Sequence, residues 1–160
     1  LCKVKCHRGL TLKMPQGETS VSLSTQGQSL VSVSLLNDVQ QTLFIIQAEL
    51  AGAPKTVAKE KVKAVEKVID KIEKKLPPIK TFFISGGTEL ATLFDYARTV
   101  ARRAERRAWL AEAEAKAARN KSVLGKHSLA YLNRLSSLLY ALARLANHES
   151  GITEESPSYS

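Results

Sequence analysis

The sequence predicts an all-α protein: a helical bundle preceded by an irregular N-terminal segment. Three observations favour this class. Leu and Ala are abundant while aromatic residues form only 6% of the 160 residues, which is typical of helices packed on helices. Apolar residues recur at spacings of three and four through most of the chain after residue 35, as they do on one face of a helix. The chain is 44% hydrophobic and 24% charged, an ordinary globular composition that excludes a disordered protein.

The chain divides into three segments of different composition. Residues 1–34 are expected to be irregular, because the stretch from Glu18 to Ser34 is rich in Ser, Thr, Gln and Gly. Residues 35–150 carry the periodic apolar pattern and are expected to form the helical domain. Residues 151–160 are expected to form a polar tail.

Two features are not expected from the sequence: a zinc site in the N-terminal segment and a membrane-spanning helix. Cys2, Cys6 and His7 offer too few ligands for a zinc site, so no metal site is expected. No stretch approaches the roughly 18 consecutive apolar residues that a membrane-spanning helix needs. The chain begins with Leu rather than Met, which indicates an incomplete N-terminus.

The first two predicted helices end at helix-breaking residues. The first begins near Leu35, and Gly52 follows as its stop. The second covers the apolar pattern of residues 62–76, and Pro77 and Pro78 end it because neither ring nitrogen donates a hydrogen bond and both fix φ.

Two longer helices are predicted in the second half of the chain. Thr88 follows a pair of glycines and is a good N-cap for a helix that runs from about Glu89 to past Trp109. A polar loop at residues 120–125 interrupts the pattern, and a fourth helix covers about residues 128–147.

The net charge of +9 and a pI near 9.7 predict an anionic partner. Residues 55–80 hold nine lysines and four acids, which we interpret as an ordinary solvated helix face. The arginines are more informative, because on a helical wheel one side of the third helix carries charge and another side is apolar. The charged side holds Asp95, Arg98, Arg102, Glu105 and Arg106, and the apolar side holds Leu90, Phe94, Ala97, Ala101, Ala104 and Ala108.

The fourth helix carries a matching polar stripe of Asn133, Ser137, Tyr140 and Arg144. Asn has a poor helix propensity, so Asn133 is unfavourable there unless its side chain makes a contact. Two helices with polar stripes predict a shared polar cleft. Such a cleft suits a polyphosphate, because arginine binds phosphate oxygens through paired, charge-assisted hydrogen bonds.

These blocks, in this order, resemble the PduO-type ATP:cob(I)alamin adenosyltransferases. The most specific are GG-x(10)-R-x(3)-RR-x-ER and YLNRLS, followed by LARLAN. The resemblance extends to LNDVQQTLFIIQAELA, KVIDKIEKKLPPIKTFFISGG and HESGITEE, and so covers about residues 35–155.

The resemblance implies an enzyme with a five-helix bundle that assembles as a homotrimer, with its sites between subunits. It would transfer the 5′-deoxyadenosyl group of ATP to cob(I)alamin and release tripolyphosphate. ATP and the reduced corrinoid are then the substrates, Mg²⁺ accompanies ATP, and no nucleic acid or membrane partner is expected. The compartment would be the cytoplasm of a prokaryote or the mitochondrial matrix of a eukaryote.

The resemblance also assigns roles to individual residues. Arg102, Arg103, Glu105 and Arg106 match the ATP-contacting RRxER of the family, with Arg102 as the catalytic residue. Asn133 matches an asparagine that contacts ATP.

Four further residues take roles at the edges of this site. Arg98 matches an arginine that forms an intersubunit salt bridge, and Phe82 matches an aromatic residue on the corrinoid side that helps displace the lower axial ligand of cobalt. Thr11 and Gly17 belong to the stretch that matches the phosphate loop and are expected to contact ATP.

The sequence departs from the family pattern in its N-terminal third. Met14-Pro15 replaces Gly-Asp in the phosphate loop, and Pro15 removes an amide donor. The block that supplies the acidic partner of Arg98 is not found, and Ser137 stands where the family has Asp.

Two alternatives therefore stay open. An inactive trimeric scaffold of the same fold is favoured by the altered phosphate loop. A basic helical module for RNA or another polyanion would use the faces at residues 55–80 and 98–107. Scarce aromatic residues for base stacking, and the acids within the arginine stripe, argue against the second alternative.

Overall fold

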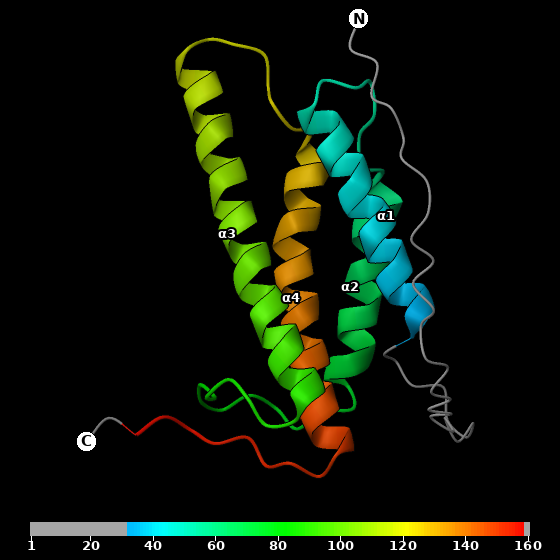
Figure 1. Ribbon diagram of the computed structural model, residues 1–160, viewed down its shortest axis with the longest axis vertical. Helices are drawn as coiled ribbons and strands as arrows, with labels where there is room; N and C mark the ends of the chain where they lie inside the picture. Colours follow the sequence, from blue (N-terminus) through cyan, green and yellow to red (C-terminus); the bar gives the residue numbers. More distant parts are fainter. Residues whose placement is uncertain (1–31, 159–160) are drawn as a thin grey trace, which may run out of the picture.

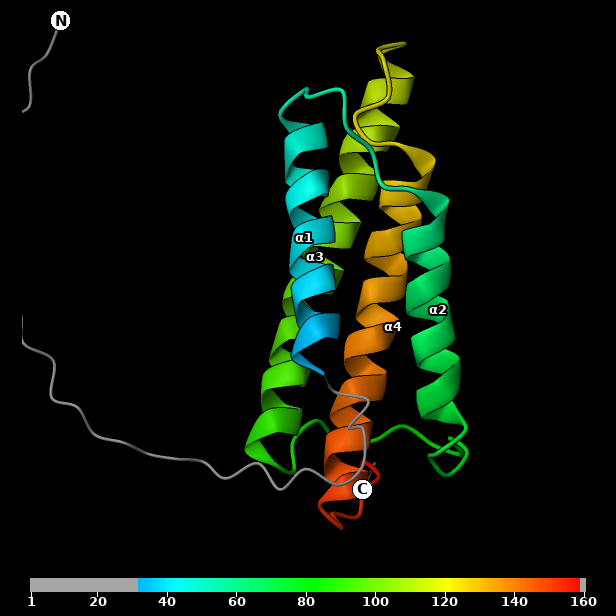
Figure 2. The same cartoon turned by 90° about the vertical axis from the view of Figure 1, so that its right-hand side faces the viewer.

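Four helices form an up-and-down bundle in the computed structural model, which describes residues 32–158 (Figure 1). They are α1 (Val33–Leu50), α2 (Lys59–Glu73), α3 (Glu89–Ala117) and α4 (Lys126–Glu149). Consecutive helices run in opposite directions (Figures 1 and 2). The predicted all-α class is confirmed. The resemblance implied five helices, and the described residues hold four of them.

Side-chain caps and prolines mark the helix ends, and of these the Thr88 cap and the Pro77-Pro78 stop were predicted from the sequence. The Ser32 hydroxyl accepts a hydrogen bond from the Leu35 amide at 3.2 Å and caps α1. The Thr88 hydroxyl accepts one from the Ala91 amide at 3.1 Å and caps α3. The helix α2 ends at Glu73, shortly before the two prolines.

The helix α4 lies in the middle of the bundle, with the other three around it (Figures 1 and 2). Every residue from 141 to 147 is buried, so this end of α4 is covered on all sides. Its main partners are α3 and α2. A residue of α4 that carries a polar group must therefore find a partner on a neighbouring segment, because an unpaired buried polar group is costly.

The predicted apolar side of α3 is partly wrong. Phe94 and Ala101 are buried as expected, but Leu90 and Ala104 are exposed, and Ala91 and Glu105 are buried instead. The physical reason is that α3 packs mainly on one helix, α4, so only a narrow strip of its surface is covered. The covered strip lies to one side of the row that Ala97, Ala101, Ala104 and Ala108 form along the helix.

A long connection between α2 and α3 lies at the same end of the bundle as the C-terminal segment (Figure 1). The two are joined by a hydrogen bond from the Ile84 amide to the Glu155 carbonyl at 2.9 Å. None of the helices in residues 32–158 is long and apolar enough to cross a membrane.

Candidate functional site

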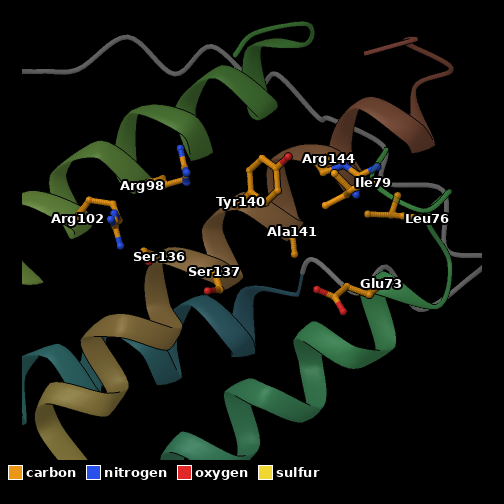
Figure 3. A pocket seen from close by; sticks show the side chains of 10 residues that line it. All are labelled: Glu73, Leu76, Ile79, Arg98, Arg102, Ser136, Ser137, Tyr140, Ala141 and Arg144. Atoms are coloured by element: carbon orange, nitrogen blue, oxygen red, sulfur yellow. The ribbon is translucent and has the colours of Figure 1, made fainter. Parts of the chain in front are cut away.

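A cleft of about 370 Å³ opens between α3, α4 and the end of α2 (Figure 3). The polar stripes of α3 and α4 meet there, as the sequence predicted. Three arginines line it: Arg102 pairs with Glu105 and Arg144 with Glu154, so among the described lining residues Arg98 is the arginine that forms no ion pair and can attract an anion. Its polar lining consists of Glu73, Arg98, Arg102, Ser136, Ser137, Tyr140 and Arg144.

Glu105 lies at one end of this cleft and joins α3 to α4. Its side chain is only 7% exposed, and both of its carboxylate oxygens are used. One accepts a hydrogen bond from Arg102 Nη1 at 3.1 Å, and the other accepts one from Asn133 Nδ2 at 2.6 Å. A buried carboxylate is stable only when it is paired in this way. Glu105 therefore fixes both polar groups, and Asn133 has the contact that its place inside a helix requires.

Arg98 is held by an aromatic ring rather than by an acid. Its guanidinium lies over the ring of Tyr140, 5.1 Å from the centroid, in a cation–π contact. Burial raises the pKa of Tyr140, while the charges of Arg144 and Arg98 act in the opposite direction. The phenol therefore keeps its proton at neutral pH and presents its ring face to Arg98.

Asp95 shares the charged side of α3 with the arginines, but its carboxylate binds a group outside the helix. Its carboxylate accepts a hydrogen bond from the Gly86 amide at 3.1 Å, in the connection that precedes α3. The wheel places Asp95 near Arg98 on the same side, but it cannot show that a backbone amide outside the helix competes for the carboxylate.

Further arginines lie on the outer side of α3. A shallow groove of about 730 Å³ is lined by the residues Arg98, Thr99, Arg102, Arg103, Arg106, Arg107 and Leu110. The described residues that line it include five arginines and no acid. Arg98 and Arg102 border both the cleft and this groove, so the two form one continuous cationic surface around α3.

The remaining predicted site residues lie elsewhere. Phe82 is 79% exposed on the connection between α2 and α3 and does not line the cleft. Thr11 and Gly17 lie outside the described residues, as do Cys2 and Cys6. In the described part of the chain, no three His, Cys, Asp or Glu side chains gather where they could hold a metal ion.

Arg144 was predicted on the polar face of the fourth helix, but it is buried. It forms an ion pair with Glu154 at 2.9 Å and donates to the carbonyl of Pro77 at 3.2 Å. Its guanidinium also lies 5.1 Å from the centroid of the Phe83 ring. The sequence signal for this role is an arginine inside the apolar run LYALARLAN.

The family model for cobalamin adenosyltransferases matches residues 17–146, which is most of the chain. The chain belongs to the cobalamin adenosyltransferase family. Two relatives are corrinoid adenosyltransferases PduO, from Citrobacter freundii at 39% identity and from Salmonella typhimurium at 37%. They match 72% and 76% of this chain. The chain spans only 34% and 37% of the length of these two relatives.

Other family members agree in sequence and in structure. The corrinoid adenosyltransferase of Mycobacterium tuberculosis is 36% identical over 74% of this chain and 63% of its own length. A solved structure of a PduO-type ATP:corrinoid adenosyltransferase variant from Lactobacillus reuteri, complexed with cobalamin and ATP, superposes with a TM-score of 0.67 at 27% identity. That match covers 79% of this chain and 68% of the other.

A double-mutant cycle tests whether Glu105 and Asn133 hold the two helices together. We expect Glu105→Ala and Asn133→Ala to be coupled by about 1–2 kcal/mol in the free energy of unfolding, because each removes the partner of a charge-assisted hydrogen bond. The measurement is urea unfolding of both single variants and the double variant at one protein concentration.

The ion pair between Arg134 and Glu66 is a matched control, because it also joins α4 to another helix but has half-exposed side chains. Its coupling energy should stay below about 1 kcal/mol. A coupling between Glu105 and Asn133 that is no larger than this control would contradict the structural role of Glu105.

Proposed function

We propose that the protein transfers the 5′-deoxyadenosyl group of ATP to cob(I)alamin and so forms adenosylcobalamin and tripolyphosphate. The observation that carries this proposal is the arrangement of Arg102, Glu105 and Asn133 next to the arginine-lined groove of α3. Membership of the cobalamin adenosyltransferase family supports the same reaction. The chain spans only about a third of the length of its PduO relatives, so the activity of those longer proteins cannot simply be transferred to it. The proposal therefore rests first on the geometry of the site.

The chemistry of this transfer suits a site built from arginines. Co(I) supplies the electron pair that forms the cobalt–carbon bond at C5′, and the C5′–O bond breaks with its electron pair going to the triphosphate. No protein nucleophile or general base is needed. The protein has to align C5′ with cobalt and stabilise the negative charge that develops on the leaving group.

Arg102 is the proposed catalytic residue, because it borders both the cleft and the groove and its direction is set by the buried Glu105. Arg103 and Arg106 are proposed to bind the triphosphate from the groove, and Asn133 to bind ATP beside Arg102. We propose that Glu105 takes part in ATP binding by holding these two groups, since both of its oxygens are already occupied.

The phosphate loop and the metal complete the proposed ATP site. Thr11 and Gly17 are proposed to contact ATP through the altered phosphate loop. The described residues offer no acidic cluster for Mg²⁺, so we propose that the ion arrives bound to the triphosphate oxygens, as is common for this cation.

The corrinoid and the subunit interface are proposed to use the exposed apolar residues. Phe82, at 79% exposure, is available to cover the lower face of the corrinoid and to keep its axial ligand and water away from cobalt. Leu93, Tyr96 and Val100 leave an apolar surface on α3, which supports a homotrimer with sites between subunits. Arg98, which lines the cleft on another side of α3, is proposed to form the intersubunit salt bridge.

The cellular compartment of the protein depends on the organism from which it comes. Matching relatives include several bacterial proteins and a corrinoid adenosyltransferase of the mouse. We propose the cytoplasm for a bacterial source and the mitochondrial matrix for a eukaryotic one.

Direct conversion tests the proposed activity. The protein is mixed with ATP, Mg²⁺ and chemically reduced cobalamin without oxygen, and the visible spectrum is followed. We expect the cob(I)alamin spectrum to be replaced by that of adenosylcobalamin, and no change when ATP is omitted. No conversion, together with no heat of ATP binding in calorimetry, would overturn the enzyme and favour an inactive scaffold.

Replacing the proposed catalytic arginine should abolish turnover, and it should also lower the free energy of unfolding because Arg102 pairs with the buried Glu105. Arg102→Ala is expected to lower kcat by about 10²–10³-fold or more, because it removes a preorganised positive charge from the leaving group. The matched control is Arg134→Ala, which removes an arginine of α4 that pairs with Glu66 instead. Near-normal turnover of Arg102→Ala would show that the arginine stripe is only a solvated face.

A further inference from the structure

We propose that Asn147 is a positioning residue that sets Phe82 relative to the arginines of α3. It does so by joining the last turns of α4 to the connection that carries Phe82. This inference rests on the proposed function, because it concerns how the corrinoid side of the site is placed relative to the ATP side.

Asn147 is 6% exposed and uses both ends of its side-chain amide on one short segment. Its Oδ1 accepts hydrogen bonds from the Thr88 amide at 3.0 Å and from the Thr88 hydroxyl at 3.4 Å. Its Nδ2 donates to the Gly86 carbonyl at 2.8 Å. A neutral amide with one donor end and one acceptor end suits this segment, whereas a carboxylate or an alkyl side chain does not.

The backbone at Gly87 approaches Asn147 so closely that a side chain is excluded. A Cβ atom at Gly87 would lie 2.3 Å from Asn147 Oδ1, and φ at Gly87 is +101°. Gly86 also has a positive φ, +132°, but a Cβ there would meet nothing within 4 Å. Glycine is therefore required at the two positions for different reasons. At position 86 the reason is the backbone conformation alone, and at position 87 it is also the close contact with Asn147.

The segment that Asn147 holds is also bound to α3. The Gly86 amide donates to Asp95 at 3.1 Å, and Thr88 is the N-cap of the helix. Asp95 precedes Arg98 by three residues, which is about one turn of the helix. Asn147 thus connects the core of α4 with the turns of α3 that lead to the arginines.

The other end of the connection is held by α4 as well. Arg144 donates to the Pro77 carbonyl at 3.2 Å and lies over the ring of Phe83. The C-terminal segment adds the hydrogen bond between Ile84 and Glu155 at 2.9 Å. Figure 1 shows the connection and the C-terminal segment together at this end of the bundle.

Phe82 lies between these attachments and is itself 79% exposed. Its ring has little packing to fix it, so its position depends on the backbone on either side. Of the attachments, Asn147 alone joins that backbone to the N-cap of α3 through three hydrogen bonds. Loss of Asn147 should therefore displace Phe82 without removing any group that we assign to ATP.

Three variants of the full chain test this inference. Asn147→Leu removes all three hydrogen bonds and replaces the amide with an alkyl side chain of similar volume. Gly87→Ala forces a methyl group against the Asn147 amide, and Gly86→Ala is the matched control, since it carries a similar backbone cost without the contact. For each variant we would measure ATP affinity by calorimetry, conversion of cob(I)alamin, and the visible spectrum of cob(II)alamin bound with saturating ATP.

We expect Asn147→Leu and Gly87→Ala to lower kcat/KM for the corrinoid by about 10- to 100-fold, since a misplacement of about 1 Å has effects of that size. ATP affinity should change less than about 2-fold, because about 1.4 kcal/mol is needed for each tenfold change and no ATP group is removed. The spectrum of these two variants should show less cob(II)alamin with its lower ligand displaced, because Phe82 is no longer held in place. Gly86→Ala should have a clearly smaller effect than Gly87→Ala, because it carries the strain of a positive φ without the clash with Asn147.

The outcomes separate this inference from the proposed function. Conversion by the unsubstituted protein with unchanged corrinoid kinetics in Asn147→Leu would overturn the inference alone. Equal losses of ATP affinity and turnover, or equal effects of Gly86→Ala and Gly87→Ala, would show a general structural role and overturn it too. An unsubstituted protein that neither binds ATP nor converts cob(I)alamin would overturn the proposed function and this inference together.

Discussion

The structure depends on a buried carboxylate that is satisfied from two helices. The side chain of Glu105 is buried, so its carboxylate has to accept hydrogen bonds from Arg102 on its own helix and from Asn133 on α4. Those bonds hold the long helix α3 against the central helix α4 at one register. They also set the direction of the arginine that we propose as catalytic. A single electrostatic requirement thus stabilises the fold and orders the site.

The proposed reaction needs two substrates to meet, and the structure provides one region for each. The cationic surface of α3 suits a triphosphate, and the exposed Phe82 on the preceding connection suits the flat face of a corrinoid. The two regions are linked near the N-terminus of α3, where Asp95 accepts a hydrogen bond from the Gly86 amide and Asn147 donates one to the Gly86 carbonyl. Alignment of the substrates then depends mainly on backbone attachments at this end of the bundle.

Local signals in the sequence predicted most of the fold. Proline pairs, caps such as Thr88 and the apolar period each act within a few residues, so the helix ends agreed with the structure. Partners far apart in the chain were not predictable in this way. The wheel placed Glu105 on the charged stripe that faces the predicted cleft, but nothing local shows that Asn133 is its partner. The partner of Asp95 and the role of Asn147 were missed for the same reason.

The proposed function rests on the role of Glu105 in preparing Arg102 and Asn133 for ATP. Calorimetric titration of ATP into Glu105→Gln tests it most directly, because glutamine keeps the volume and an acceptor for Asn133 but removes the carboxylate that orders Arg102. We expect an affinity about 10- to 100-fold weaker than that of the unsubstituted protein, in line with about 1.5–3 kcal/mol for a charged hydrogen bond. Equal ATP affinity in a folded Glu105→Gln variant would contradict it.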